Sequence, residues 1–541
     1  MAAIADFLSD IIDGCGLVAF GLALGGVAWS LIILRAHRPD TPFAGAPTAR
    51  AVSLIRLGAI GLGTAEVIEL AANAYILADT MGRAPFPELY HVAYFQAGLA
   101  RALLAFVMAA AAAWLARAPH EGRRWIGLSA IGFAIVAAAA WHSHGASRIE
   151  YREPLMALTA IHAFAGALWA GSVIHLLALR LQIWRENALR PLWPIAIARF
   201  WVLGIGAVGL ALLTATPLAL YYVKSLASLL GTGYGSIVAA KTLLLGSALA
   251  FAGLNFRAGK RWARSGATGE VTRRVPHYIE AETFILISLL MAAAALAHQP
   301  PALDVGSERA SIAEVVQVFA PKLPKVTSPA HAEMPTDPDN PLGLSAHDQS
   351  LEDEWSEYNH NVSGLVLISI SLLALLSRRE GLGWARHWPL GFVALAVFLF
   401  IRSDPENWPL GHVPFWVGFA NAEVLQHRVA ILLAGVLGLV EWRAHLAQDQ
   451  EPWYAYVFPV LAAIGGLLLL THSHSAFELK PQYLIQLSHT VMGILAVFLA
   501  CGRWLELRLE PPGSRWAGLA AVYAMLLIGV VLTFYKENII V

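Results

Sequence analysis

Long apolar runs separated by short polar segments dominate the chain. A helix needs about 20 mostly apolar residues to cross the hydrocarbon core of a bilayer, and that template predicts about fourteen spanning helices here. The expected spans are 13–34, 51–78, 92–116, 124–141, 154–181, 196–222, 235–257, 277–298, 359–377, 386–402, 421–443, 454–471, 483–506 and 516–535. The pattern therefore predicts an all-α fold, a polytopic membrane bundle.

Basic residues concentrate in every second loop of this arrangement. The first loop contains Arg35, Arg38 and Arg50, and the loop after the seventh span holds six basic residues between 257 and 274. Cytoplasmic loops carry the excess of Lys and Arg in membrane proteins. We therefore expect the odd-numbered loops inside the cell, and the even-numbered loops and both termini outside.

One long polar stretch interrupts the apolar pattern. Residues 299–358 are rich in Pro, Asp and Glu, which is the composition of an exposed linker. This stretch follows the eighth expected span, so it is predicted to lie on the outer face, in a bacterium the periplasm. It would divide an eight-helix membrane domain, 1–298, from a six-helix domain, 359–541.

The composition excludes several classes of protein. Only 14% of the 541 residues are charged, against about 25% in soluble domains, so a lipid bilayer is the expected surrounding. Equal numbers of basic and acidic residues, 37 each, argue against nucleic-acid binding. The two cysteines are too few for a disulfide framework or a thiolate metal site. The sequence also lacks a phosphate loop and a nucleophile elbow, so no enzymatic activity is predicted.

Histidine is unusually frequent, with 19 residues, and six of these residues lie in a sequence repeat. A His-Ser-His triplet ends the fourth and the twelfth expected spans, and a further His lies in the span after each. The six imidazoles are His142, His144 and His162 in the first copy and His472, His474 and His489 in the second. An arginine precedes each triplet, Arg101 by 41 residues and Arg428 by 44. The two halves therefore share a partial internal repeat.

The repeated histidines are predicted to bind metal near the outer face. Ionisable residues at membrane depth are costly and tend to be functional, and neutral imidazole is the commonest metal ligand. His427 is expected at the same depth as His162 and His489, about 10 Å below the outer helix ends. His360 is a further candidate ligand, and Glu423 stands four residues before His427, on the same helical face. Glu423 would be a ligand or a carboxylate that orients one.

The remaining imidazoles on the expected inner side are predicted to have structural roles. They are His37, His120, His175, His277, His387 and His445.

A second set of ionisable residues lies within the expected spans. Glu66, Glu69 and Asn73 share one face of a helix because they fall at i, i+3 and i+7. Lys241 lies in the seventh span. Two interpretations stay open for these residues, a buried Glu-to-Lys241 ion pair and a path for a cation.

Ligand chemistry narrows the metal without fixing it. Imidazole suits copper, zinc, iron and nickel, whereas Cu(I) usually recruits Met or Cys sulfur. Copper as Cu(II) is therefore favoured over Cu(I), and zinc remains an alternative. A different alternative is an electron-transfer protein in which a pair such as His427 and His489 binds b-type haem.

The order of several motifs resembles the copper resistance protein D family. The resemblance rests on the segment 161–172, with His162 and a Trp-Ala-Gly-Ser end, and on 196–301, which includes Ala240-Lys241, Glu280 and a helix ending in His298. The later half resembles the C-terminal membrane extension of large bacterial members, through Tyr358-Asn359-His360, the segment 402–411 and Thr471-His472-Ser473-His474.

The resemblance implies a bacterial inner-membrane protein that takes up copper or serves copper homeostasis or resistance. It also implies a separate periplasmic copper-binding partner of the copper resistance protein C type. A scaffold that delivers copper without transporting it stays open as an alternative, because capture sites on one face look the same in both cases.

Overall fold

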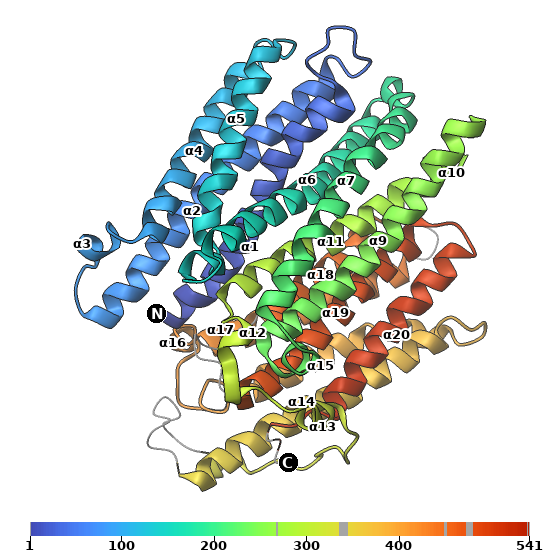
Figure 1. Ribbon diagram of the computed structural model, residues 1–541. Coiled ribbons are helices and arrows are strands. Elements are labelled where there is room, and N and C mark those ends of the chain that lie inside the picture. The colour runs from blue at the N-terminus through green and yellow to red at the C-terminus, as the bar shows by residue number, and fades with distance from the viewer. Residues whose placement is uncertain are drawn as a thin grey trace.

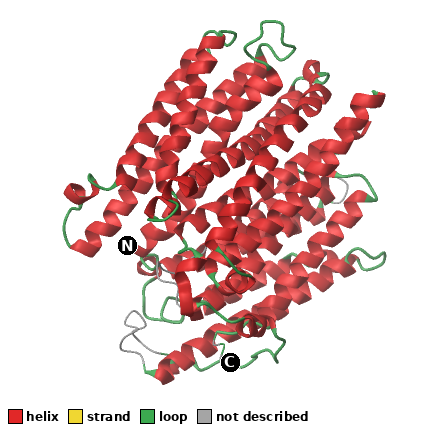
Figure 2. Ribbon diagram, viewed as in Figure 1, coloured by secondary structure: helices red, strands yellow, loops and turns green. Residues whose placement is uncertain are grey.

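The computed structural model describes residues 2–266, 269–334, 345–447, 452–471, 480–537 and 539. Long helices, many of them roughly aligned, make up most of the molecule (Figures 1 and 2). The described residues form no strand and only one isolated bridge, between Asn407 and Val413. The predicted all-α class is confirmed.

Thirteen helices in the described ranges are long and apolar enough to cross a membrane. Before residue 300 they are α1 (Ala2–Ala28, continued by a π-helical turn, Trp29–Leu34), α2 (Ala46–Met81), α4 (Ala93–Leu115), α5 (Gly122–Ala139), α6 (Arg152–Arg185), α7 (Leu192–Tyr222), α9 (Gly233–Ser265) and α11 (Val275–His298). After it they are α14 (Ala346–Leu376), α17 (Ala422–Leu446), α18 (Val457–Thr471), α19 (Lys480–Arg508) and α20 (Gly513–Thr533). The polytopic membrane fold is therefore confirmed.

The remaining expected span, 386–402, is a short helix. It forms α15 (Leu390–Arg402), and its 13 residues extend about 20 Å at 1.5 Å per residue. The preceding residues Gly383–His387 form a 3₁₀ turn, and Pro389 occupies the N-cap. Proline favours the start of a helix and lacks the N–H that an earlier start would need. The apolar run thus begins to form an α-helix later than its hydropathy predicts.

Shorter helices connect the long ones. They are α3 (Phe86–Leu89), α8 (Leu226–Gly231), α10 (Gly269–Arg273), α12 (Ala302–Val305), α13 (Ile312–Phe319) and α16 (Phe415–Gly418). The segment 299–358, expected to be a linker, contains α12, α13 and the first residues of α14. A capping box starts α13, in which Ser311 and Glu314 satisfy each other's backbone N–H groups. That signal was readable in the sequence.

Glycines allow helices of the first half to approach closely. A Cβ atom on Gly171 of α6 would lie 1.8 Å from the carbonyl oxygen of Gly21 on α1. Small residues are the usual means of close helix contact in membranes, where helices lack a hydrophobic driving force for association. The α1–α6 contact therefore depends on the missing side chain.

The two halves of the chain pack against each other through α11. This helix contacts α18 and α19, which lie beside it in Figure 1. One apolar cluster contains residues of α1 to α11 together with Leu470, Val497 and Leu505 from the second half. The halves therefore share a common core.

Candidate functional site

A buried polar network joins α2, α4 and the turn after α5. Arg101 on α4 forms an ion pair with Glu66 on α2, with 2.8 Å between Nη1 and Oε1, and both side chains are at most 7% exposed. The same Nη1 lies 3.2 Å from Nδ1 of His142. Tyr94 donates a hydrogen bond to Glu69 and stacks on the His142 ring, with 4.3 Å between centroids. The structure thus brings Glu66 and Glu69 together with the first His of the triplet.

Asn73 belongs to the same network. Its side-chain amide lies 3.4 Å from the Tyr94 hydroxyl, at the edge of hydrogen-bond range. The predicted polar face of α2 therefore points at one set of partners on α4.

Two acidic residues and one imidazole that sequence reasoning did not select lie beside this network. Asp10 of α1 pairs with His298 at the end of α11 at 2.8 Å. Asp13 interacts electrostatically with Glu69, His298 and Arg101. The available signal was the i, i+3 spacing of Asp10 and Asp13 in an apolar helix, which repeats the spacing of the α2 carboxylates.

The imidazoles of the first triplet point to different neighbours. Ser143 has extended backbone angles, φ −91° and ψ 154°, between two short 3₁₀ turns, Ala140–His142 and His144–Ser147. His142 ends the first turn and contacts Arg101 and Tyr94 of α4. His144 begins the second turn and lies between Tyr222 and Tyr234, about 6 Å from each ring centroid. Burial lowers the pKa of His144, which keeps its ring neutral.

The third imidazole of the first copy is held by α7. Nδ1 of His162 lies 3.1 Å from the carbonyl oxygen of Ala211 and 3.1 Å from the Thr214 hydroxyl. His142, His144 and His162 therefore have separate partners, and the structure does not gather them into one ligand set. Their metal binding stays a prediction.

Lys241 lies apart from the carboxylates of α2. None of the ion pairs within the described part of the chain involves Lys241, and its charge acts instead on His162. The expected Glu-to-Lys241 pair is thus missing from the described ion pairs. A role in a cation path stays a prediction.

In the second half, several predicted ligands group around Tyr535. The ring of His360 on α14 stacks on Tyr535 with centroids 4.0 Å apart, and the ring of His489 on α19 lies 6.1 Å from that of His360. His427 and Glu423 on α17 interact electrostatically with His360. The structure therefore places His360 and His489 beside each other, with His427 and Glu423 near enough to act on His360 electrostatically. His472 and His474 lie outside the described residues.

The loop after α15 adds carboxylates that sequence reasoning missed. Asp404 accepts a hydrogen bond from Nδ1 of His427 at 2.7 Å. Burial, with Asp404 and Glu423 nearby, raises the pKa of Glu406 to about 7. Both residues belong to the segment 402–411, which resembles large bacterial members of the family. Their position in this motif could have marked them as candidate site residues.

Hydrogen bonds fix which ring nitrogen carries a proton. A carbonyl or carboxylate oxygen only accepts, so Nδ1 is the donor in His360 to Ser356 (2.9 Å) and in His489 to Ile485 (3.2 Å). In each neutral ring the lone pair is then on Nε2. This arrangement is the usual one for metal-ligating imidazoles, whose other N–H is held by an acceptor.

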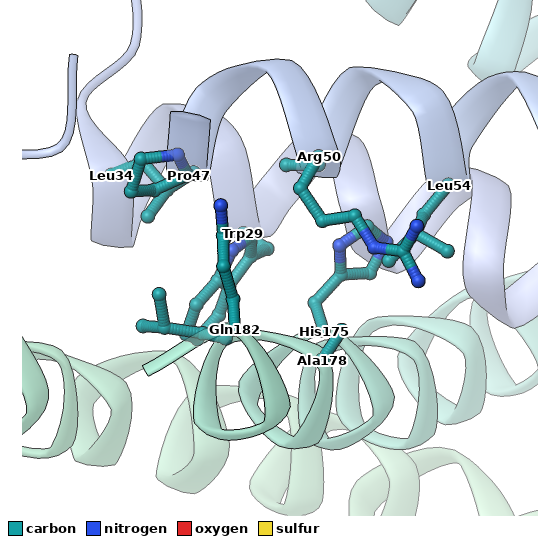
Figure 3. A pocket seen from close by; sticks show the side chains of 10 residues that line it. Trp29, Leu34, Pro47, Arg50, Leu54, His175, Ala178 and Gln182 are labelled. Atoms are coloured by element: carbon teal, nitrogen blue, oxygen red, sulfur yellow. The ribbon is translucent and has the colours of Figure 1, made fainter. Parts of the chain in front are cut away.

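Two of the imidazoles predicted to be structural, His175 and His120, hydrogen-bond to the backbone. His175 donates from Nε2 to the carbonyl oxygen of Leu22 at 2.9 Å. Its ring packs near Trp29, with 6.4 Å between centroids, in a small pocket that also includes Arg50 (Figure 3). His120 contacts the backbone in the same way at 3.2 Å. These contacts agree with the structural interpretation.

Within the ranges that the structure describes, no group of three or more His, Cys, Asp or Glu residues has the geometry to hold a metal ion. The arrangement therefore offers pairs of imidazoles and nearby carboxylates rather than a complete ligand set.

Comparison with known proteins adds one finding. Residues 194–296 match the family model described as Copper resistance protein D. The match runs from α7 to α11 and confirms the predicted family over that segment. No curated protein and no solved structure matches the chain.

Proposed function

Because its α7–α11 segment belongs to the copper resistance protein D family, we propose that the chain is a bacterial inner-membrane protein that binds copper at the predicted outer face. Its expected role is copper uptake into the cytoplasm, or copper homeostasis and resistance. Beside the family match, the observation that carries the proposal is the imidazole pair of His360 and His489.

The spacing of this pair supports a shared ion. With metal–nitrogen distances of about 2.0–2.1 Å, two imidazoles on one ion have ring centroids about 5–6 Å apart. The rings of His360 and His489 are 6.1 Å apart, and each has its lone pair on Nε2. His427 and Glu423 are the nearest further ligands predicted from the sequence, and His472 and His474 complete the proposed set.

The ligand chemistry supports Cu(II) more than Cu(I). The proposed second-half ligands are imidazole nitrogens and a carboxylate, whereas Cu(I) prefers sulfur. Asp404 holds His427 through Nδ1, the same device that orients imidazoles in known metal sites. Zinc binding would contradict the copper assignment but not the site.

We propose that the first half contains a second copper site and an entry path. His142 and His144 would capture the ion, and His162 would receive it within the membrane. Glu66, Glu69 and Asn73 would form the path on α2, with Lys241 as a further charged group. The network of buried carboxylates around Arg101 supports a role in handling cations, because buried charges at membrane depth tend to be functional.

Metal analysis of the full chain, with optical and electron paramagnetic resonance spectra, tests the proposal. Wild-type protein is expected to contain copper, and His360→Ala with His489→Ala is expected to lose one site. His120→Ala is the matched control, because that imidazole hydrogen-bonds to the backbone carbonyl of Ala36 at the predicted inner end. Unchanged copper content in the double variant would refute the site, and a Soret band would favour the haem alternative.

A second experiment separates transport from delivery. Sealed proteoliposomes are loaded with the purified chain, and total copper inside is counted over time. Accumulation above that of protein-free liposomes supports uptake, and binding without accumulation supports a delivery scaffold. The same preparation tests whether a periplasmic protein of the copper resistance protein C type acts as copper donor.

A further inference from the structure

His142 differs from the other candidate ligands in its hydrogen bonding. Its Nδ1 is 3.2 Å from Nη1 of Arg101, and a guanidinium can only donate. Nδ1 of His142 must therefore accept, so the neutral ring carries its proton on Nε2. The partner of Nδ1 in His360, His427 and His489 is an oxygen. His142 alone among these four presents its Nδ1 lone pair to a cation of the protein.

Three buried atoms around this guanidinium lack partners. Among the described residues, none forms a hydrogen bond with Oε2 of Glu66, Nε of Arg101 or Nε2 of His142. The Tyr94 backbone lies near enough to interact with the His142 ring, but Nε2 forms no hydrogen bond that meets the usual distance and angle limits. Glu66 and Arg101 are 3% and 6% exposed, so water does not readily replace the missing partners. The observed contacts therefore leave the network incomplete.

A small movement of Arg101 satisfies two of these atoms together. If the guanidinium turns fully toward Glu66, Nε can donate to Oε2 in the two-pronged pair that guanidinium and carboxylate groups favour. That movement withdraws Nη1 from His142. Glu69 already accepts a hydrogen bond from Tyr94, whereas Oε2 of Glu66 accepts none from the described residues. Glu66 is therefore the carboxylate that can receive Nε of Arg101.

We propose that Arg101 is a tethered cation that occupies the Nδ1 lone pair of His142, and that an arriving copper ion replaces it there while Arg101 closes onto Glu66. The step moves no proton, because the ring keeps its proton on Nε2 and Arg101 stays charged. Arg101 is thus a positioning residue that sets when His142 is open to metal. The proposal rests on the proposed copper-binding function.

The surrounding charges favour the exchange. The described groups that face the network from neighbouring helices are Asp10 and Asp13 on α1 and His298 on α11, together with Glu66 and Glu69 on α2. Four carboxylates thus face one guanidinium and the two imidazoles of His142 and His298. An excess of acidic groups in a low-dielectric interior attracts a further cation.

The test removes the competing cation and keeps the charge balanced. Arg101→Leu with Glu66→Gln is made in the full chain, in a His360→Ala/His489→Ala background that leaves only the first-half site. Copper affinity is expected to rise about tenfold or more, because a charge-assisted hydrogen bond no longer competes for Nδ1. Electron paramagnetic resonance of the copper-loaded forms is expected to show the same number of nitrogen ligands in this variant as in the background with Arg101 and Glu66 intact. His142→Ala is expected to remove one nitrogen ligand and to abolish the gain in affinity.

A control and a second variant keep the test decisive. Arg261→Leu with Glu270→Gln removes an ion pair in the loop predicted to lie inside the cell, away from the proposed outer sites, and is expected to leave copper affinity unchanged. Arg101→Lys keeps one positive charge but cannot form the two-pronged pair, so copper affinity is expected to fall between wild type and the double variant. If the double variant does not fold, Arg101→Lys still tests whether Arg101 competes with copper for Nδ1 of His142.

Unchanged or weaker copper binding in the Arg101 variants, with wild type binding copper, would overturn this inference alone. A wild-type chain without copper would overturn the proposed function.

Discussion

Glu280 on α11 forms a buried connection between the two halves. Arg508 on α19 donates two hydrogen bonds to it, at 3.0 and 2.8 Å, and Trp504 donates a third at 2.9 Å. The Glu280 side chain is 6% exposed and that of Arg508 is 31% exposed. His277 on α11 lies 3.2 Å from the same carboxylate. Replacing Glu280 with Gln keeps the volume but removes the charge that Arg508, Trp504 and His277 share.

The expected cost follows from these contacts. A hydrogen bond to a charged group contributes about 1.5–3 kcal/mol. Because Gln retains an oxygen acceptor and solvent reaches part of Arg508, we expect Glu280→Gln to lower the free energy of unfolding by about 2–3 kcal/mol. A double-mutant cycle with Arg508→Gln should give a coupling energy of about 2 kcal/mol.

Equilibrium unfolding of the full chain in mixed micelles measures both quantities. Glu88→Gln is the matched control, because its ion pair with Arg83 is on the surface, with side chains 42% and 58% exposed. Exposed pairs contribute about 0.2–1 kcal/mol. A coupling energy below about 0.5 kcal/mol between Glu280 and Arg508 would refute the view that this contact holds the halves together.

Three further outcomes are expected. The hydrogen bond from Lys480 lowers the pKa of Glu314 to about 2. Its contribution to the free energy of unfolding should therefore be complete above pH 4.5 and lost as the pH falls toward 2. When the free energy of unfolding is measured against pH, this loss should be absent in Glu314→Gln. Gly171→Leu should separate α1 from α6 and reduce the yield of folded protein in size-exclusion chromatography, because its Cβ meets backbone of α1 at 1.8 Å; a yield equal to wild type would contradict the close contact. Asp404→Asn should weaken copper binding about 10–100-fold by loosening His427, measured by competition with a chelator; unchanged affinity would exclude the orienting role.

Helix type and approximate position were predictable from the sequence for a local reason. Inside a bilayer each backbone N–H and C=O must find its partner within the segment, so length and hydropathy suffice to identify a helix. The exception was the span at 386–402, where Pro389 delays the start. The capping box at Ser311 and Glu314 was equally local, and it predicts a helix inside the segment interpreted as a linker.

The candidate site was predictable only in part. The choice of His360, His427 and His489, and the similar depth of His427 and His489, followed from the sequence pattern. The Tyr535 ring beside His360 and His489 did not, because it follows the end of α20, more than forty residues after His489 in the chain. Asp404 was missed for the same reason, since its hydrogen bond to His427 joins a loop to another helix.

The sequence by itself determined an all-helical membrane protein with a repeated His-Ser-His motif and a segment that resembles the copper resistance protein D family. Only the tertiary structure decided where each imidazole points. His142 contacts Arg101 and Tyr94 on α4, whereas His144 lies between Tyr222 and Tyr234. Helix rotation and packing set these directions, and they depend on contacts between segments distant in the chain. Thus the same motif that predicted two equivalent ligands gives one imidazole held by Arg101 and another enclosed by aromatic rings.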